Sequence, residues 1–171
     1  EDGWTVEEGA LVRKGRGGDL WTAKPYGDFI LELEFLTTGN SGILFRKPDP
    51  AKVAKDRLEI QIITPSKAPT KHTCGSLYDC LAASKELCRK DEWNHLRLTS
   101  ANNRVQVELN GETVLDANLE EWTEAGKNPD GSKNKFGQPL REFARKGYIG
   151  LQDHGKEVHY RNLRIKPLTS E

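Results

Sequence analysis

Side chains capable of acid–base chemistry lie inside or directly after segments with the alternation of β-strands. Glu59 and Gln61 alternate with three aliphatic residues, Arg46 ends an apolar run, and Asp153 and His154 follow another. Because side chains alternate with a period of two along a strand, a sheet that buries one face can present such groups together on the other. This layout predicts a shallow polar platform, which suits a carbohydrate better than an apolar ligand.

Each of these residues has a chemical use and a simpler structural alternative. A partly shielded Glu59 could act as a general base or acid, unless its face is merely solvated. Arg46 offers a planar fork of donors to sugar hydroxyls, an enolate oxygen or a carboxylate, unless it forms a surface ion pair. His154 could transfer a proton or bind a metal, with Asp153 orienting it, unless the two residues only shape a turn.

Further polar and aromatic residues are candidates for holding a sugar beside Gln61. Tyr78 could supply a stacking face or a hydroxyl, although core packing would also explain it. Trp122, at the edge of a long loop, is the best candidate for a sugar-stacking platform. Glu34 shares a strand face with a second carboxylate, and Asn40 lies in an Asn-Ser-Gly segment that resembles a turn.

Length and charge restrict the classes of function. The chain has 171 residues, so we expect one domain over 1–171. Its 26 basic and 26 acidic residues balance, which argues against nucleic acid or an anionic membrane as a partner. No apolar run approaches the ~18 residues needed for a membrane span. The sequence has no Met and opens on Glu1, so we expect a processed product with a secretory signal removed, located in the periplasm or secreted.

The three cysteines, Cys74, Cys80 and Cys88, lie close together in the sequence. Free, partly buried thiols are the simplest expectation. One disulfide with a spare thiol is the next, with Cys80 and Cys88 as the preferred pair. The spacings do not match a common zinc knuckle.

The dominant period along the chain is two, with clear alternation in 29–36 and 104–109. Asn110-Gly111 follows the second run as a two-residue hairpin signal. Further strands are expected near 10–13, 19–23, 42–46, 57–63, 93–99, 147–152 and 157–166. Helix is expected only as a turn or two within 49–56, 117–124 and 139–145. About ten short strands with little helix predict an all-β protein, a two-sheet antiparallel β-sandwich of the jelly-roll type.

One connection, roughly 120–146, is unusually long. Loops of this length in a compact domain are usually functional or disordered. On a β-sandwich, such a loop can wall one end of a concave face.

Several short motifs, in their order and spacing, resemble one known family. The motifs are Gly-Trp-Thr-Val-Glu-Glu-Gly at 3–9, Gly-Asp-Leu-Trp at 18–21, Tyr-Gly-Asp-Phe at 26–29, Gly-Asn-Ser-Gly-Ile at 39–43, Glu-Ile-Gln at 59–61, Gly-Ser-Leu-Tyr at 75–78, Glu-Trp-Asn at 92–94 and Gly-Tyr-Ile-Gly-Leu-Gln-Asp-His-Gly at 147–155. Together they resemble the 3-keto-disaccharide hydrolase family, formerly a domain of unknown function, nearly from end to end. The sequence departs from the family at 74–92, where the cysteines replace a Pro- and Lys-rich segment.

The resemblance implies a concanavalin A-like lectin/glucanase fold and an enzyme that cleaves the glycosidic bond of 3-keto-glycosides or 3-keto-disaccharides. In the chemistry expected, a base removes the proton next to the ketone, an enolate forms, the leaving group is eliminated and water adds. We expect His154 or Glu59 as the base, and Arg46 or a bound divalent metal ion as the enolate stabiliser. No other cofactor is implied.

Other functions are compatible with the same residues. Glu34 and Glu59 could form the carboxylate pair of an ordinary glycosidase. A non-catalytic, lectin-like carbohydrate-binding module of a secreted protein is the main alternative, because fold does not fix function; a structural or interaction domain is a weaker one. Convergence of Glu59, Arg46 and His154 on one pocket would favour an enzyme.

Overall fold

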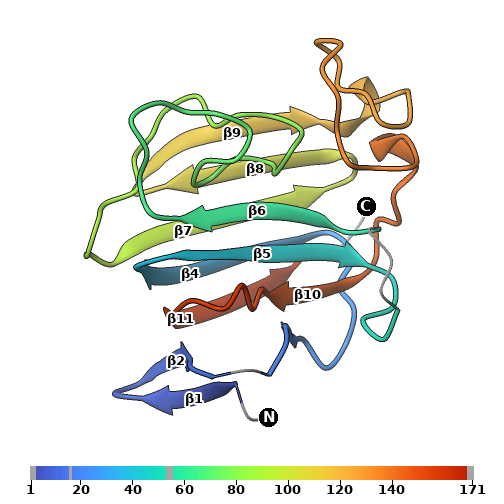
Figure 1. The fold of residues 1–171 in the computed structure, drawn as a ribbon. Helices are drawn as coiled ribbons and strands as arrows, with labels where there is room; N and C mark the ends of the chain where they lie inside the picture. The colour runs from blue at the N-terminus through green and yellow to red at the C-terminus, as the bar shows by residue number, and fades with distance from the viewer. Residues whose placement is uncertain (1–2, 16, 53–55, 169–171) are drawn as a thin grey trace.

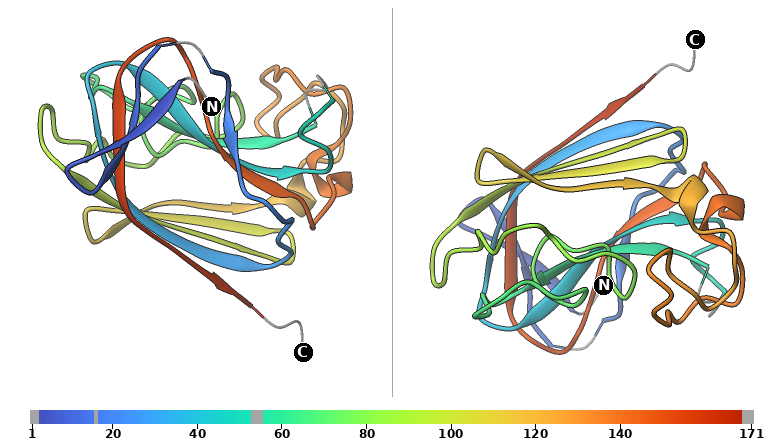
Figure 2. Two further views of the ribbon diagram at one scale, coloured as in Figure 1. Left: turned by 90° about the horizontal axis from the view of Figure 1, so that it is seen from below. Right: turned by 90° about the horizontal axis from the view of Figure 1, so that it is seen from above.

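Two antiparallel β-sheets packed face to face make up the protein (Figures 1 and 2). The structure, a computed structural model, describes residues 3–15, 17–52 and 56–168. The seven-stranded sheet has the order β1-β2-β11-β4-β7-β8-β9, and the four-stranded sheet has the order β3-β10-β5-β6. The expected two-sheet antiparallel sandwich is therefore confirmed.

The strand bounds follow the alternating segments of the sequence. The strands are β1 (Trp4–Glu7), β2 (Ala10–Arg13), β3 (Leu20–Trp21), β4 (Phe29–Thr37), β5 (Asn40–Lys47), β6 (Leu58–Ile63), β7 (Asn94–Ala101), β8 (Arg104–Leu109), β9 (Glu112–Asn118), β10 (Tyr148–Leu151) and β11 (Val158–Pro167). Only β1 lies outside the strands expected from the sequence. It pairs with β2 at the end of the large sheet, and three of its four residues are exposed, which leaves it without an apolar face for the pattern to reveal.

Helix is as scarce as the pattern predicts. Within the described residues there are two short 3₁₀ turns, η1 (Leu119–Glu121) and η2 (Leu140–Glu142), both inside expected segments. The third expected segment, 49–56, includes residues 53–55, which lie outside the described residues. No helix in the described part of the chain is long and apolar enough to cross a membrane.

The core lies between the two sheets. In β4 the four residues from Phe29 to Phe35 with odd numbers are buried and their neighbours are half-buried. In β6 the aliphatic residues Leu58, Ile60 and Ile62 are fully buried. Each such side chain contributes roughly 1.5–3 kcal/mol when it leaves water, so both sheets are fixed with these faces inward. Their other faces are left for solvent or function.

The hairpin expected at Asn110-Gly111 is present. Leu109 pairs with Glu112, and both turn residues have positive φ, 52° and 88°. A two-residue hairpin turn with positive φ at both positions matches the strand twist, and Asn-Gly tolerates it best.

The three cysteines are free and buried. The preferred pair, Cys80 with Cys88, is not the pair that the fold brings together. The thiols of Cys74 and Cys88 share a hydrogen bond, which together with burial raises the pKa of Cys74. Burial also raises the pKa of Cys80, to about 12. These thiols therefore behave as small apolar core residues.

Two long connections lie on the side of the four-stranded sheet, 64–93 in green and 120–146 in orange (Figure 2). The second is anchored in the core by Trp122, Phe136 and Phe143, whose exposed fractions are 3% or less. Its buried Asn128 accepts a hydrogen bond from Trp122 Nε1 at 2.9 Å and donates to the carbonyl of Asp79 at 3.2 Å. This amide ties the two connections together.

Candidate active site

The outer face of the four-stranded sheet carries a row of polar side chains in register. Glu59 pairs with Leu44, and Gln61 pairs with Gly42. On the other side of β5, the backbone N–H of Gln152 donates to the carbonyl of Gly42 at 2.9 Å. Since paired residues share a face, Gln61 and Gln152 point outward on either side of a glycine.

Tyr78 reaches this face because the 75–78 segment pairs with the free edge of β6. The Tyr78 N–H donates to the Glu59 carbonyl at 2.9 Å, and the Gln61 N–H donates to the Ser76 carbonyl at 3.1 Å. Tyr78 is thereby placed directly beside Glu59.

These elements enclose a small pocket of about 170 Å³. It is lined by Asn40, Arg57, Glu59, Gln61, Tyr78, Lys135, Phe136, Gln152 and His154. Five of the candidates named from the sequence are thus brought together: Asn40, Glu59, Gln61, Tyr78 and His154. Lys135 and Phe136 come from the 120–146 connection, which does wall one side of the face.

Gly42 provides part of the space in this pocket. A Cβ atom placed on it would lie 3.0 Å from Oε1 and 3.1 Å from Cγ of Glu59. Any side chain at this position would push the carboxylate aside. The close approach, rather than an unusual backbone conformation, is what requires glycine here.

Glu59 is a nearly buried carboxylate with loose contacts. It is 5% exposed. Its Oε2 lies 3.4 Å from the ammonium of Lys135, and its Oε1 accepts a hydrogen bond from Nε2 of Gln152, also at 3.4 Å. Both distances are at the long limit for hydrogen bonds, so the carboxylate is charge-balanced yet still able to accept a proton from a ligand.

Three buried polar atoms at the pocket have no hydrogen-bond partner among the described residues: Oε1 of Gln61, Oε1 of Gln152 and Nε of Arg57. An unpaired buried polar group costs about 1–3 kcal/mol. Unpaired buried groups beside a pocket mark its wall as polar, as expected of a site that binds a hydroxyl-rich ligand.

Tyr78 completes one wall with a neutral hydroxyl. Burial, followed by the negative charges of Glu59 and Asp79, raises the pKa of Tyr78. The ammonium of Lys135 sits 4.2 Å from the centre of its ring. Such a cation–π contact holds the lysine over the pocket without using its hydrogen-bond donors.

Arg46 does not lie in this pocket, contrary to the prediction. Strict alternation would place it beside Leu44, but a β-bulge in the pairing of β5 with β10 and a φ of 56° at Arg46 turn the side chain inward. Its guanidinium donates to the Ser100 hydroxyl at 3.3 Å, to Asn103 Oδ1 at 3.1 Å and to the Asn102 carbonyl. Burial lowers its pKa to about 10. Arg46 therefore joins the two sheets as a structural residue.

Glu34 and Trp122 are also elsewhere. Glu34 is on β4 of the other sheet, where Arg161 donates to it at 2.6 Å and holds its pKa low. It cannot pair with Glu59 as a glycosidase dyad, because the sandwich separates their outward faces. Trp122 is 2% exposed and packs in the core, so it is not a stacking platform.

Asp153 anchors the turn that carries His154. Its carboxylate pairs with Arg13 at 2.6 Å and accepts hydrogen bonds from the N–H groups of Gly18 and Gly155. Burial opposes ionisation, but these partners outweigh it and lower the pKa of Asp153. Asp153 therefore fixes the turn through Arg13 and backbone N–H groups, and it positions His154 through the chain rather than through the imidazole. His154 itself is exposed at the pocket rim.

The pocket does not provide an evident metal site. Among the described residues, no group of three His, Cys, Asp or Glu side chains is placed to hold an ion. Glu59 and His154 are the two side chains of this kind lining the pocket. We therefore assign no catalytic step to a metal ion.

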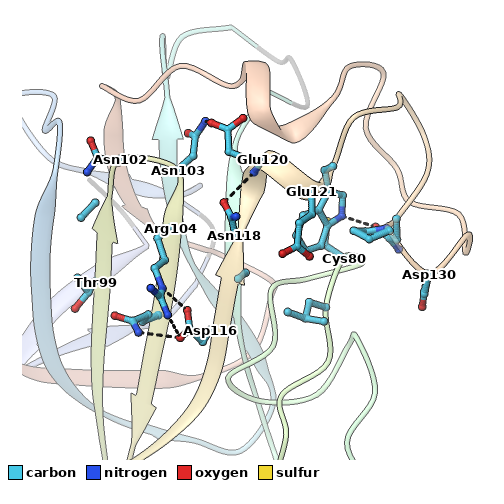
Figure 3. A pocket seen from close by; sticks show the side chains of 17 residues that line it. Cys80, Thr99, Asn102, Asn103, Arg104, Asp116, Asn118, Glu120, Glu121 and Asp130 are labelled. Carbon is cyan, nitrogen blue, oxygen red and sulfur yellow. Dashed lines mark hydrogen bonds and ion pairs between the residues drawn. The ribbon is translucent and has the colours of Figure 1, made fainter.

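A larger hollow of about 820 Å³ lies over β7, β8 and β9 and the start of the 120–146 connection (Figure 3). There Arg104 donates to both oxygens of Asp116, at 2.7 and 2.5 Å, and Gln106 donates to the same carboxylate at 3.0 Å. The Arg104–Asp116 pair is exposed, at 62% and 38% of the two side chains. These groups satisfy one another, so the smaller pocket with its open acceptors is the stronger candidate.

The protein is thus a two-sheet jelly roll with a polar, acid-bearing pocket on the outer face of its four-stranded sheet. The carbohydrate-binding module CBM66 from Bacillus subtilis has this fold, with a TM-score of 0.58 over 95% of this chain and 90% of that one, at 13% identity. The chain belongs to the family described as the 3-keto-alpha-glucoside-1,2-lyase-like domain, whose pattern matches residues 1–166. The resemblance seen in the sequence is confirmed.

Two relatives are named as sugar-cleaving enzymes. A 3-keto-disaccharide hydrolase from Bacteroides thetaiotaomicron is 27% identical over 96% of this chain and 70% of its own length. A candidate glycosyl hydrolase from Parabacteroides distasonis is 33% identical, with a TM-score of 0.88 over 96% of this chain and 90% of that one. These names support a glycosyl hydrolase-like function for the chain.

Sequence reasoning missed four pocket residues: Arg57, Lys135, Phe136 and Gln152. The sequence could have revealed Gln152, because it lies in the same motif as His154. It also lies two residues after Gly150, which pairs with Leu44 of β5. Arg57 directly precedes the Glu59 strand, but flanking position alone does not show where a side chain points. Lys135 and Phe136 depend on how a long loop folds back, which no local pattern encodes.

Proposed function

We propose that this protein cleaves the glycosidic bond of 3-keto-glycosides by proton abstraction, elimination and hydration. The observation that carries the proposal is Glu59, a 5% exposed carboxylate in a pocket lined mainly by polar side chains. A general base needs a shielded, loosely held carboxylate within reach of the substrate proton. Membership of the family adds the 3-keto substrate class.

In the proposed reaction, Glu59 takes the proton from carbon 2 of the sugar. The C–H electrons turn the single bond between carbons 2 and 3 into a double bond, and the π electrons of the carbonyl move to the oxygen on carbon 3, giving an enolate. The carbonyl then re-forms, a double bond forms between carbons 1 and 2, and the bond from carbon 1 to the leaving oxygen breaks. Finally, water adds its hydroxyl to carbon 1 and a proton returns to carbon 2, so the net result is hydrolysis.

Other pocket residues fit supporting roles. We expect His154, exposed at the rim, to give a proton to the departing oxygen and to accept one from the incoming water. The side-chain amides of Gln61 and Gln152, which line the pocket, can form hydrogen bonds with sugar hydroxyls. The neutral hydroxyl of Tyr78 can donate one.

The size of the pocket agrees with this assignment. Sites for drug-sized ligands are ~300–1,000 Å³, whereas this pocket is about 170 Å³. It therefore suits the single ring that reacts, with the leaving group extending past His154 into solvent.

The test compares substrates that differ only at carbon 3. The protein is incubated with 3-keto-trehalose and with trehalose, each with and without a chelator, while sugar release is followed. We expect release from the keto sugar alone. Equal cleavage of both sugars would indicate an ordinary glycosidase, and binding without cleavage of the keto sugar would favour a lectin-like module. Loss of release with the chelator would show that a metal ion takes part.

A further inference from the structure

The proposed reaction creates a negative charge on the oxygen of carbon 3, and Arg46, expected to stabilise it, is buried between the sheets. A developing enolate in a partly dry site needs a fixed donor or cation, which is usually a large contribution to catalysis. Two cationic side chains line the pocket instead, Arg57 and Lys135.

Of the two cations, Lys135 is in contact with the proposed base. Its ammonium lies 3.4 Å from Glu59 Oε2, and its side chain is 29% exposed. The proton on carbon 2 and the oxygen on carbon 3 belong to adjacent atoms of the ring. A base and a cation that lie side by side can therefore face both atoms when the ring lies against them.

The ammonium of Lys135 also has donors to spare. Besides Glu59, it lies near the rings of Tyr78 and Phe136, at 4.2 and 5.5 Å from their centres. An ammonium has three donors, and ring faces attract it without accepting a full hydrogen bond. By contrast, Lys71 donates to the Lys133 carbonyl at 2.5 Å and pairs with Asp79.

The backbone that carries Lys135 is held firmly. The next residue, Phe136, is 3% exposed and packs edge-on against Phe143 at 5.2 Å. Its N–H donates to the side chain of Asn134 at 3.0 Å, and its carbonyl accepts from Gly126 at 2.7 Å. A cation on such a segment is pre-organised, as stabilisation of a transition-state charge requires.

We propose that Lys135 is a catalytic residue whose ammonium donates a hydrogen bond to the oxygen on carbon 3 as the enolate forms. This inference rests on the proposed function and assigns it a residue from the long connection. Lys135 stays an ammonium throughout, since it supplies charge and a hydrogen bond while Glu59 carries the proton from carbon 2.

The test follows enolate formation separately from bond cleavage. A 3-keto-glucoside is incubated in D₂O, and both deuterium uptake at carbon 2 and sugar release are measured for the parent, Lys135→Met and Lys135→Arg. We expect Lys135→Met to lower kcat and deuterium uptake together by about 100- to 1,000-fold, as loss of an oxyanion donor does. Lys135→Arg should recover part of the loss. Lys133→Met, an exposed lysine on the same connection but outside the pocket, is the matched control and should change neither rate.

Each outcome has a distinct meaning, provided that melting curves show folded variants. Parent-like deuterium uptake in Lys135→Met would overturn the assignment while the proposed function stands. A raised KM with an unchanged kcat would also overturn it, because it would show ground-state binding alone. A parent protein that neither exchanges nor cleaves the keto sugar would overturn the proposed function, and the role of Lys135 with it.

Discussion

Among single residues, two glutamates differ in how their carboxylates are hydrogen-bonded, and this difference separates a candidate base from a structural residue. Glu59 and Glu34 both alternate with aliphatic residues on strands, yet their partners differ. Glu34 accepts short hydrogen bonds from Arg161 and Asn162, at 2.6 and 3.0 Å, so both of its oxygens are held by structural partners. The side-chain contacts of Glu59 with Lys135 and Gln152 are long, at 3.4 Å, and Glu59 lines a pocket. Of the two carboxylates, Glu59 is therefore the one available to a ligand.

Glu59→Gln is therefore expected to lower kcat/KM on a 3-keto-glycoside by about 100-fold or more, the usual contribution of general acid–base catalysis. Glu34→Gln is the matched control, and its kcat/KM should stay within about twofold of the parent, since its site is on the other sheet. Steady-state kinetics on both variants, with melting curves, make the comparison. Equal losses in the two variants would show that the effect comes from folding rather than from proton transfer.

At the scale of elements, β5 does two different tasks within a few residues. Its first half approaches Glu59 so closely that Gly42 is needed. Its second half bulges and turns Arg46 into the core, where it holds the β7–β8 turn. The pocket and the join between the sheets are therefore built from one strand.

Gly42→Ala should lower activity without unfolding the protein. The added methyl group would lie 3.0 Å from Oε1 of Glu59, so the carboxylate must move. A shift of about 1 Å at a catalytic group can cost roughly 100-fold, and we expect a fall in kcat of tenfold or more. Gly27→Ala is the control, because nothing lies within 4 Å of a Cβ atom there. Kinetics with the two alanine variants measure the effect, and a fully active Gly42→Ala variant would refute this placement of Glu59.

Arg46→Met should destabilise the fold rather than act on the chemistry. It leaves Asn103, the Asn102 carbonyl and the buried Ser100 hydroxyl without their donor, and an unpaired buried polar group costs about 1–3 kcal/mol. We expect the free energy of unfolding to fall by about 3 kcal/mol. Arg104→Met, which breaks an exposed ion pair, should cost less than about 1 kcal/mol. Urea unfolding of both variants gives the two values, and similar losses would contradict the structural role of Arg46.

At the scale of the whole molecule, the sequence predicts the sheets better than it predicts the site. Alternation predicts the sandwich and the outward face of Glu59 and Gln61, because burial of one strand face has a simple period, and Asn110-Gly111 predicts the hairpin. Alternation does not assign strands to sheets, so it left open a Glu34–Glu59 pair that the sandwich separates.

The sequence also mispredicts the positions of Arg46 and Trp122 and misses Lys135, because all three depend on backbone conformation or packing that only the folded chain defines. A positive φ at Arg46 breaks the alternation, and nothing in the residue type predicts it. Trp122 is drawn into the core, where Asn128 accepts a hydrogen bond from its indole. Lys135 enters the pocket only because Phe136, its neighbour, is buried.

The central claim is that the pocket of about 170 Å³ on the four-stranded sheet binds the reacting sugar. A crystal structure of the Glu59→Gln variant with a 3-keto-glucoside tests this claim most directly. We predict one sugar ring lying against residue 59 and Lys135, with carbon 2 facing the new amide and the oxygen on carbon 3 facing the ammonium. A sugar bound instead in the larger hollow beside Arg104 and Asp116 (Figure 3), with the smaller pocket empty, would contradict the account.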